Sequence, residues 1–160
     1  MATPAENDVP RSFTNTRPLV YLACVCEKVL REEGGVLTLV RVVDTFYVAG
    51  VPEELPAKVK GGAEVWAVIG LKSGDLVGQF TIGLQVRNPT GEVRVRQEWP
   101  IVLDGGVQGA TFVLRMMVEA SQLGTHWIDV LWEGSERLTG VPFRLLQQQP
   151  PTDQPPTESP

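Results

Sequence analysis

Short segments in which apolar and polar residues alternate, each followed by a turn rich in glycine or proline, recur along most of this chain. A period of two residues places successive side chains on opposite faces of a strand, and regular turn signals are typical of antiparallel β structure. No internal segment keeps the 3.6-residue apolar spacing of an amphipathic helix. We predict an all-β domain, an antiparallel two-sheet β-sandwich of about seven to nine strands, with candidate strands at 19–30, 36–48, 63–72, 78–88, 92–102, 110–119, 126–133 and 140–147.

The clearest hairpin is predicted over residues 78–102. The segment Asn88-Pro89-Thr90-Gly91 has the residues of a type I turn, with asparagine first, proline second and glycine last. This pairing sets Arg87 opposite Glu92. One face is apolar and the other is charged, which predicts a sheet with one solvated face. Because glutamates are interleaved with its arginines, we interpret the charged face as a solvated surface rather than a phosphate site; the arginines are Arg87, Arg94 and Arg96.

The first hairpin contains charges inside segments that otherwise look buried on both faces. A two-residue turn at Gly34-Gly35 would oppose Lys28 and Arg41, two like charges that destabilise a strand pair. A three-residue loop that starts at Glu33 instead sets Glu27 opposite Arg41, and we prefer this register. Strands that are apolar on both faces are covered on both faces. We therefore expect the second sheet to cover one face of the first hairpin and the 50–61 loop or a partner subunit to cover the other.

Three residues are candidates for recognition: Asp44, Trp127 and Arg41. Asp44 lies in an apolar-rich segment, where a buried carboxylate needs hydrogen-bond partners. We interpret it as an acceptor for the backbone of a neighbouring loop or, alternatively, as a recognition residue. Trp127 is either a partly exposed residue at the rim of the sheet or the aromatic anchor of an interface, where tryptophan is favoured. It lies opposite the predicted core face of the last hairpin, formed by Ile128, Val130 and Trp132.

The charge of the chain bears on its partners. A net charge of −5 over 160 residues argues against a general electrostatic affinity for nucleic acid or for an anionic membrane. No run of about 18 apolar residues predicts a membrane span. Residues 1–17 and the Pro- and Gln-rich residues 148–160 lack the apolar content of a folded segment, so we predict two disordered arms around one domain, 18–147. The N-terminal residues show no apolar core of an export signal, which favours a cytoplasmic location.

The residues that usually carry chemistry are sparse. Cys24 and Cys26 are two positions apart on a predicted strand, a separation of about 6.5–7 Å that lies at the outer limit for a disulfide. We predict two reduced thiols, buried as small apolar residues. Together with His126, the only histidine, they do not complete a four-ligand zinc site, and an apolar mid-strand position favours an inert thiol over a nucleophile. We therefore expect no catalytic residue, no metal site and no cofactor.

Two segments carry a resemblance. "CEKVLREEGGVLTLVRVVDTFYV" resembles the start of a family of small uncharacterised bacterial β-sandwich proteins, with a charged stretch, a glycine turn, and a second strand that reaches Asp44 near the aromatic Phe46. "HWIDVLWEGSERLTGVPFRLL" looks like the closing hairpin of immunoglobulin-like or macroglobulin-like sandwiches, whose last strand is entered here through Pro142 and Phe143. The match covers residues 19–147. The resemblance implies a sandwich fold and no assigned activity, so it supplies no functional residues.

The sequence favours a non-catalytic interaction module that binds a protein partner or self-associates. This hypothesis rests on the missing catalytic set, the two-sided apolar first hairpin and the four tryptophans. The alternative is an enzyme or a small-ligand-binding domain with its site in the loops at one end of the sandwich. A broad apolar patch would favour the first hypothesis, and a concave pocket with converging polar groups would favour the second.

Overall fold

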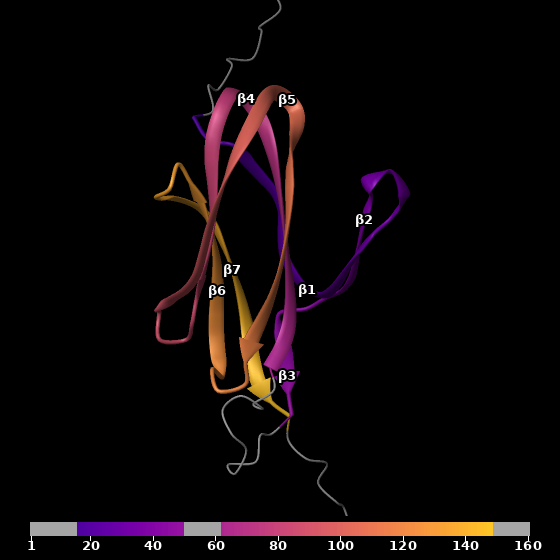
Figure 1. Cartoon of the computed structure of the whole chain (residues 1–160), viewed down its shortest axis with the longest axis vertical. Helices are drawn as coiled ribbons and strands as arrows, with labels where there is room; N and C mark the ends of the chain where they lie inside the picture. The colour runs from indigo at the N-terminus through magenta and orange to yellow at the C-terminus, as the bar shows by residue number, and fades with distance from the viewer. Residues whose placement is uncertain (1–15, 50–61, 149–160) are drawn as a thin grey trace, which may run out of the picture.

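The computed structural model describes residues 16–49 and 62–148 (Figure 1). The predicted arms and the 50–61 loop therefore lie almost entirely outside the described residues. The predicted all-β class is confirmed, and no helix in the described ranges is long and apolar enough to cross a membrane. The elements are β1 (Leu19–Arg31), the 3-10 turn η1 (Glu33–Gly35), β2 (Leu37–Val42), β3 (Thr45–Val48), β4 (Gly62–Arg87), β5 (Val93–Glu119), β6 (Gly124–Trp132) and β7 (Glu136–Gln147).

β4 and β5 form one long antiparallel hairpin that doubles over near its middle, at the top of Figure 1. Pairing begins with Gly62 opposite Glu119 and continues past the corner, with shifts of register between Lys72 and Val77. The corner contains four glycines with positive φ, a conformation that other residues rarely adopt: Gly74, Gly78, Gly105 and Gly106. The four strands predicted at 63–72, 78–88, 92–102 and 110–119 are therefore only two, β4 and β5, because these glycines bend the ladder without ending it.

The remaining strands extend this hairpin on both sides of the corner. β1 pairs with the first half of β4 and β2 pairs with β1, whereas β6 pairs with the second half of β4 and β7 pairs with β6. β3 closes the order by pairing in parallel with β7. All seven strands thus belong to one continuous sheet, in the order β2-β1-β4-β6-β7-β3 with β5 beside β4. The sheet is curled like a half-barrel (Figure 1), and the predicted division into two separate sheets is not confirmed.

The core occupies the inner side of the curled sheet. Odd-numbered residues of β4 before the corner and even-numbered residues after it join one buried cluster, which also takes side chains from every other strand except β2. The change of parity follows from the bulged corner, which turns the opposite side of the strand inward. The predicted core face of β6 is confirmed. The largest fully buried side chains of the core are Ile69, Leu71, Ile82, Leu84, Leu103, Ile128, Phe143 and Leu145.

The first hairpin has the predicted register. Pairing of Lys28 with Val40 sets Glu27 opposite Arg41, and Arg41 Nη1 lies 3.2 Å from Glu27 Oε2. The connecting loop is the predicted three-residue segment Glu33–Gly35. The two charges that interrupt the apolar pattern therefore satisfy each other.

The predicted strand 36–48 is two strands. Arg41 has a φ of 51°, in the left-handed region that few non-glycine residues adopt, and β2 ends one residue later at Val42. The chain then crosses to β7, where Phe46 joins the main core. An unbroken strand over 36–48 in the predicted register would align Asp44 and Phe46 with Cys24 and Leu22 of β1. That alignment is wrong, because the chain leaves β1 before it reaches these residues.

A second apolar cluster lies on the other face of β1 and β4. Its buried members are Cys26, Val29 and Val68, and six partly buried side chains surround them: Leu22, Cys24, Leu37, Leu39, Trp66 and Val113. The first hairpin is thus apolar on both faces, as predicted. β2 supplies part of the cover, although Figure 1 shows the end of the β1–β2 hairpin projecting from the body of the molecule.

The turn between β4 and β5 is confirmed at Asn88–Gly91. Gly91 N donates to Asn88 O at 2.9 Å, and the Asn88 side chain accepts from the backbone of Thr90 and Glu92. The predicted pairing of Arg87 with Glu92 is wrong, because Asn88 N itself donates to Glu92 O at 2.9 Å. Arg87 instead pairs in the ladder with a valine of β5, and its side chain extends toward β6.

Candidate interaction surface

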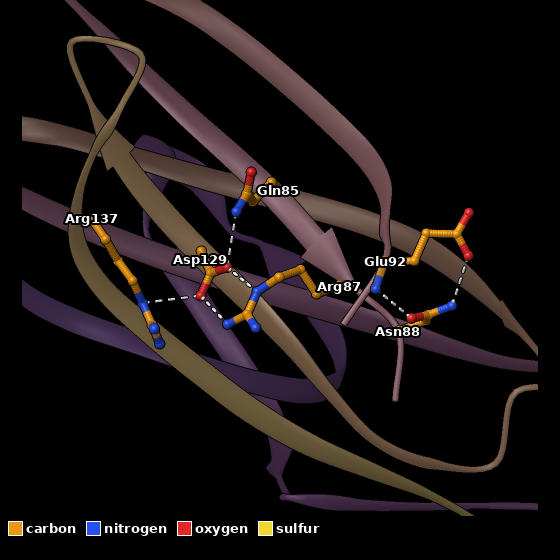
Figure 2. A network of polar contacts seen from close by, with 6 residues as sticks. All are labelled: Gln85, Arg87, Asn88, Glu92, Asp129 and Arg137. Atoms are coloured by element: carbon orange, nitrogen blue, oxygen red, sulfur yellow. Dashed lines mark hydrogen bonds and ion pairs between the residues drawn. The ribbon is translucent and has the colours of Figure 1, made fainter. Parts of the chain in front are cut away.

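A buried carboxylate with three polar partners lies on the outer face of β4, β6 and β7 (Figure 2). Arg87 holds Asp129 with two hydrogen bonds, Nε to Oδ2 at 2.5 Å and Nη2 to Oδ1 at 3.0 Å. Gln85 Nε2 donates to Oδ2 at 3.1 Å, and Arg137 Nε lies 3.0 Å from Oδ1. The side chain of Asp129 is only 2% exposed, compared with 26% for Arg87 and 47% for Arg137. The carboxylate thus lies beneath the two guanidinium groups.

Strand register places these side chains together. Gln85 and Arg87 are two residues apart on β4, so they share a face, and they lie opposite Asp129 and Trp127 of β6. On the other side of β6, Asp129 is opposite Gly140 of β7. A Cβ atom at position 140 would overlap the guanidinium of Arg137. The missing side chain of Gly140 therefore leaves the space through which Arg137 reaches the carboxylate.

The electrostatics of the cluster favour a fixed charge on Asp129. Burial would raise the pKa of this carboxyl, but hydrogen bonds from Arg87 and Gln85 and the charges of the two arginines outweigh it and lower the pKa below its usual value. The hydrogen bonds that Arg87 donates to Asp129 raise the pKa of Arg87. The cluster is therefore one negative and two positive charges at neutral pH, with a net charge of about +1.

Trp127 completes this surface. Its ring is partly exposed, and the guanidinium carbons of Arg87 and Arg137 lie 5.8 and 5.4 Å from the ring centroid. These distances are within the range of cation–π attraction. We call Arg87, Trp127 and Arg137 together the Trp–Arg platform. Two charged groups and one aromatic ring are held at fixed positions on an exposed sheet face.

The two arginines that β5 places on this face are paired with glutamates. Arg94 Nε lies 3.4 Å from Glu92 Oε2, and Arg96 donates to Glu98 Oε1 at 2.7 Å as well as to a backbone carbonyl. This arrangement agrees with the interpretation of the face as solvated and interleaved in charge. Positive charge beyond these pairs lies at the Trp–Arg platform and at the exposed Arg144 of β7, which is opposite Thr125.

The other two predicted recognition residues lie elsewhere. Asp44 is exposed where the chain passes from β2 to β3, its Oδ1 accepts from the Thr45 hydroxyl at 3.0 Å, and its backbone carbonyl accepts from Arg144 N. It lines an open groove of about 530 Å³ between β1 and β7. Arg41 lies on the projecting hairpin, paired with Glu27. The structure therefore brings neither residue to Trp127.

Sequence reasoning missed Asp129, Arg87 and Arg137 as a group. One local signal was present, because Asp129 alternates with the core residues of a strand that is otherwise apolar or aromatic. An acidic residue at such a position needs partners when it is buried. The identity of those partners depends on β4 lying beside β6, which the local pattern does not contain.

The cysteines and the histidine occupy packed positions. Cys24 and Cys26 form no disulfide, and burial raises the pKa of both thiols, which disfavours the reactive thiolate. His126 is buried, stacks on Phe143 and places its Nε2 atom 2.6 Å from Gln122 O. In the described ranges, no three His, Cys, Asp or Glu residues are grouped as metal ligands.

Comparisons with known proteins found matches among solved structures. No family model matches the chain, and no curated protein matches it. One of the matching solved structures is that of an immunoglobulin-like protein from Pseudomonas aeruginosa, with 14% sequence identity and a TM-score of 0.38. The similarity covers 76% of this chain and 90% of that protein.

Proposed function

We propose that this protein is a non-catalytic interaction module that binds a protein partner through the Trp–Arg platform. The observation that carries the proposal is the partly exposed ring of Trp127, held against two guanidinium groups that a buried carboxylate fixes in place. Tryptophan and arginine are the residues most often found at the energetic centre of protein interfaces.

The hydrogen bonds beneath the platform favour binding. Arg87 donates twice to Asp129, so its side chain loses little further conformational freedom when a partner arrives. The bound carboxylate also screens part of the positive charge, which lowers the desolvation penalty of the two guanidinium groups. A surface ordered before binding is expected to bind more tightly than one of flexible side chains.

The fold gives this surface a rigid support. Side chains from both halves of the curled sheet join one core, and we propose that the halves act as the two layers of an immunoglobulin-like sandwich. The platform lies on the outer side of one layer, on three neighbouring strands.

Self-association is the second candidate, and a different surface favours it. The projecting β1–β2 hairpin exposes Leu30, Val36 and Val42, at 41%, 58% and 60%, respectively. A second copy that packed on this hairpin would cover the apolar cluster on the outer face of β1 and β4. Sedimentation velocity of the full chain over a range of concentrations distinguishes a monomer from such a dimer.

Site-specific photo-crosslinking tests the platform. A photoreactive amino acid at Thr125 lies on the same face of β6 as Trp127, and one at the exposed Gln108, at the corner of β5, is the matched control away from the platform. In cells, we expect a protein adduct of defined mass from position 125 only, and its loss when Trp127→Ala is added. Equal adducts from both positions, or an adduct that persists in Trp127→Ala, would overturn the proposal.

A further inference from the structure

The two arginines of the platform differ in the number of N–H donors that they do not use on Asp129. A guanidinium carries five N–H donors. Arg87 uses Nε and Nη2 on Asp129, whereas Arg137 approaches Asp129 through Nε. Within the described residues, Arg137 has no other ion pair or hydrogen bond, and its side chain is 47% exposed. The Nη1 and Nη2 groups of Arg137 are therefore available to a ligand, and Figure 2 shows the guanidinium extending past the carboxylate.

The platform and its carboxylate have a net positive charge, although the net charge of the whole chain is −5. The cluster holds two guanidinium groups and one carboxylate, while Arg94 and Arg96 nearby are paired with glutamates. At physiological ionic strength, charges interact over about 8 Å. A bound group therefore meets mainly the local positive charge rather than the net charge of the molecule.

We propose that the partner recognised by the platform is an acidic polypeptide segment, in which a carboxylate pairs with the Nη groups of Arg137 and a neighbouring apolar or aromatic side chain packs on Trp127. The planar guanidinium end matches a carboxylate in a two-point contact. The adjacent indole ring provides apolar area next to that contact. This inference rests on the proposed function, since it specifies the chemistry of the partner for the same surface.

A nucleic acid fits the surface less well. Binding of a nucleic acid backbone depends on several cationic side chains that follow successive phosphates. Glu92 and Glu98 interrupt the arginines of β5 on this face and pair with them. One available guanidinium end beside one aromatic ring suits a single carboxylate with an apolar neighbour.

Side-chain NMR of the full chain tests the inference directly. The probe is the synthetic peptide acetyl-Glu-Tyr-Glu-Tyr-Glu-amide, and the controls are its lysine counterpart and an oligothymidylate of similar length. We expect the glutamate peptide alone to shift the indole N–H signal of Trp127 and the Nε–H signal of Arg137. Arg137→Gln should weaken binding about 10-fold or more, because a hydrogen bond to a charged group contributes about 1.5–3 kcal/mol.

Arg94→Gln is the matched control, since it removes a paired arginine from the same face. We expect this variant to bind the glutamate peptide as the wild type does. The inference is overturned if no signal shifts, if the two variants weaken binding equally, or if the lysine peptide or the oligothymidylate gives the same response. If the adduct at Thr125 depends on Trp127 but the glutamate peptide has no effect, the acidic partner is overturned and the proposed interaction surface is retained. If neither the adduct nor the peptide effect is observed, both the acidic partner and the interaction surface are overturned.

Discussion

Removing Arg87 should strongly destabilise the domain. The substitution Arg87→Met keeps an unbranched side chain but deletes both hydrogen bonds to Asp129, of 2.5 and 3.0 Å. It leaves a carboxylate that is 2% exposed with fewer partners than its burial requires. The destabilisation comes from this buried charge rather than from a loss of packing.

The magnitude follows from the partners that remain. Breaking a buried ion pair by removing one partner costs about 3–5 kcal/mol. Asp129 keeps Gln85 and Arg137, at 3.1 and 3.0 Å, so we expect the lower end, about 3 kcal/mol. For a domain of this size, that change lowers the midpoint of thermal unfolding by roughly 10–15 °C.

Urea unfolding followed by circular dichroism measures the loss, with an unchanged m-value as the sign that the same surface is exposed. Arg94→Met is the matched control, because its side chain is 49% exposed and its ion pair with Glu92 is long, at 3.4 Å. An exposed pair of this kind contributes about 0–1 kcal/mol. The double substitution Arg87→Met with Asp129→Leu should recover part of the loss, since the buried charge is gone.

The reasoning is refuted if Arg87→Met costs no more than Arg94→Met. It is also refuted if the double substitution is at least as destabilising as the sum of its two single changes, because the energies would then be independent of the pair.

Three further predictions follow from other features. Folding lowers the pKa of Asp129, so the stabilisation from its charged form is complete above the usual aspartate pKa of about 3.9. This stabilisation is lost as the pH falls through the folded-state pKa. The difference in unfolding free energy between wild type and Asp129→Asn should therefore be constant from about pH 7 to 5 and shrink below about pH 4. Gly109→Ala places a Cβ atom onto the backbone carbonyl of Leu71, so urea unfolding should show a loss of about 2 kcal/mol or more. Burial raises the pKa of Cys24 and Cys26, so both should react with a thiol-specific disulfide reagent at pH 7.5 at least about 10-fold more slowly in the native protein than after unfolding.

The local features of the fold were predictable because each depends on neighbouring residues. The charges of Glu27 and Arg41 were sufficient to choose between two registers of the first hairpin, and the structure has the chosen one. The sequence from Asn88 to Gly91 predicted its turn in the same way. In these cases, residue type alone discriminates between the local alternatives.

The corner between the halves of β4 and β5 was not predictable on this basis. Gly74 and Gly106 lie opposite each other in the ladder and bend both strands, but a glycine at positive φ gives the same sequence signal in a turn that ends a strand. The difference lies in whether pairing continues beyond the bend, which depends on residues far apart in the chain.

The platform shows the same limit. Trp127 could be identified as a candidate from its strand alone. Its association with Arg87 depends on the pairing of β4 with β6, in which Arg87 lies opposite a residue 40 positions later in the chain. The turn predicted at Asn88–Gly91 had suggested Glu92 as the residue opposite Arg87. Gly140, which makes room for Arg137, gave no signal other than its small size.

The doubled-over hairpin has a consequence for how the molecule forms. Once the Asn88–Gly91 turn has closed, each further rung of the ladder from β4 to β5 needs no new loop to be ordered, even where the ladder passes through the corner. Pulsed hydrogen exchange during refolding should therefore show amides of both halves becoming protected in one kinetic phase, with the β1–β2 hairpin following later.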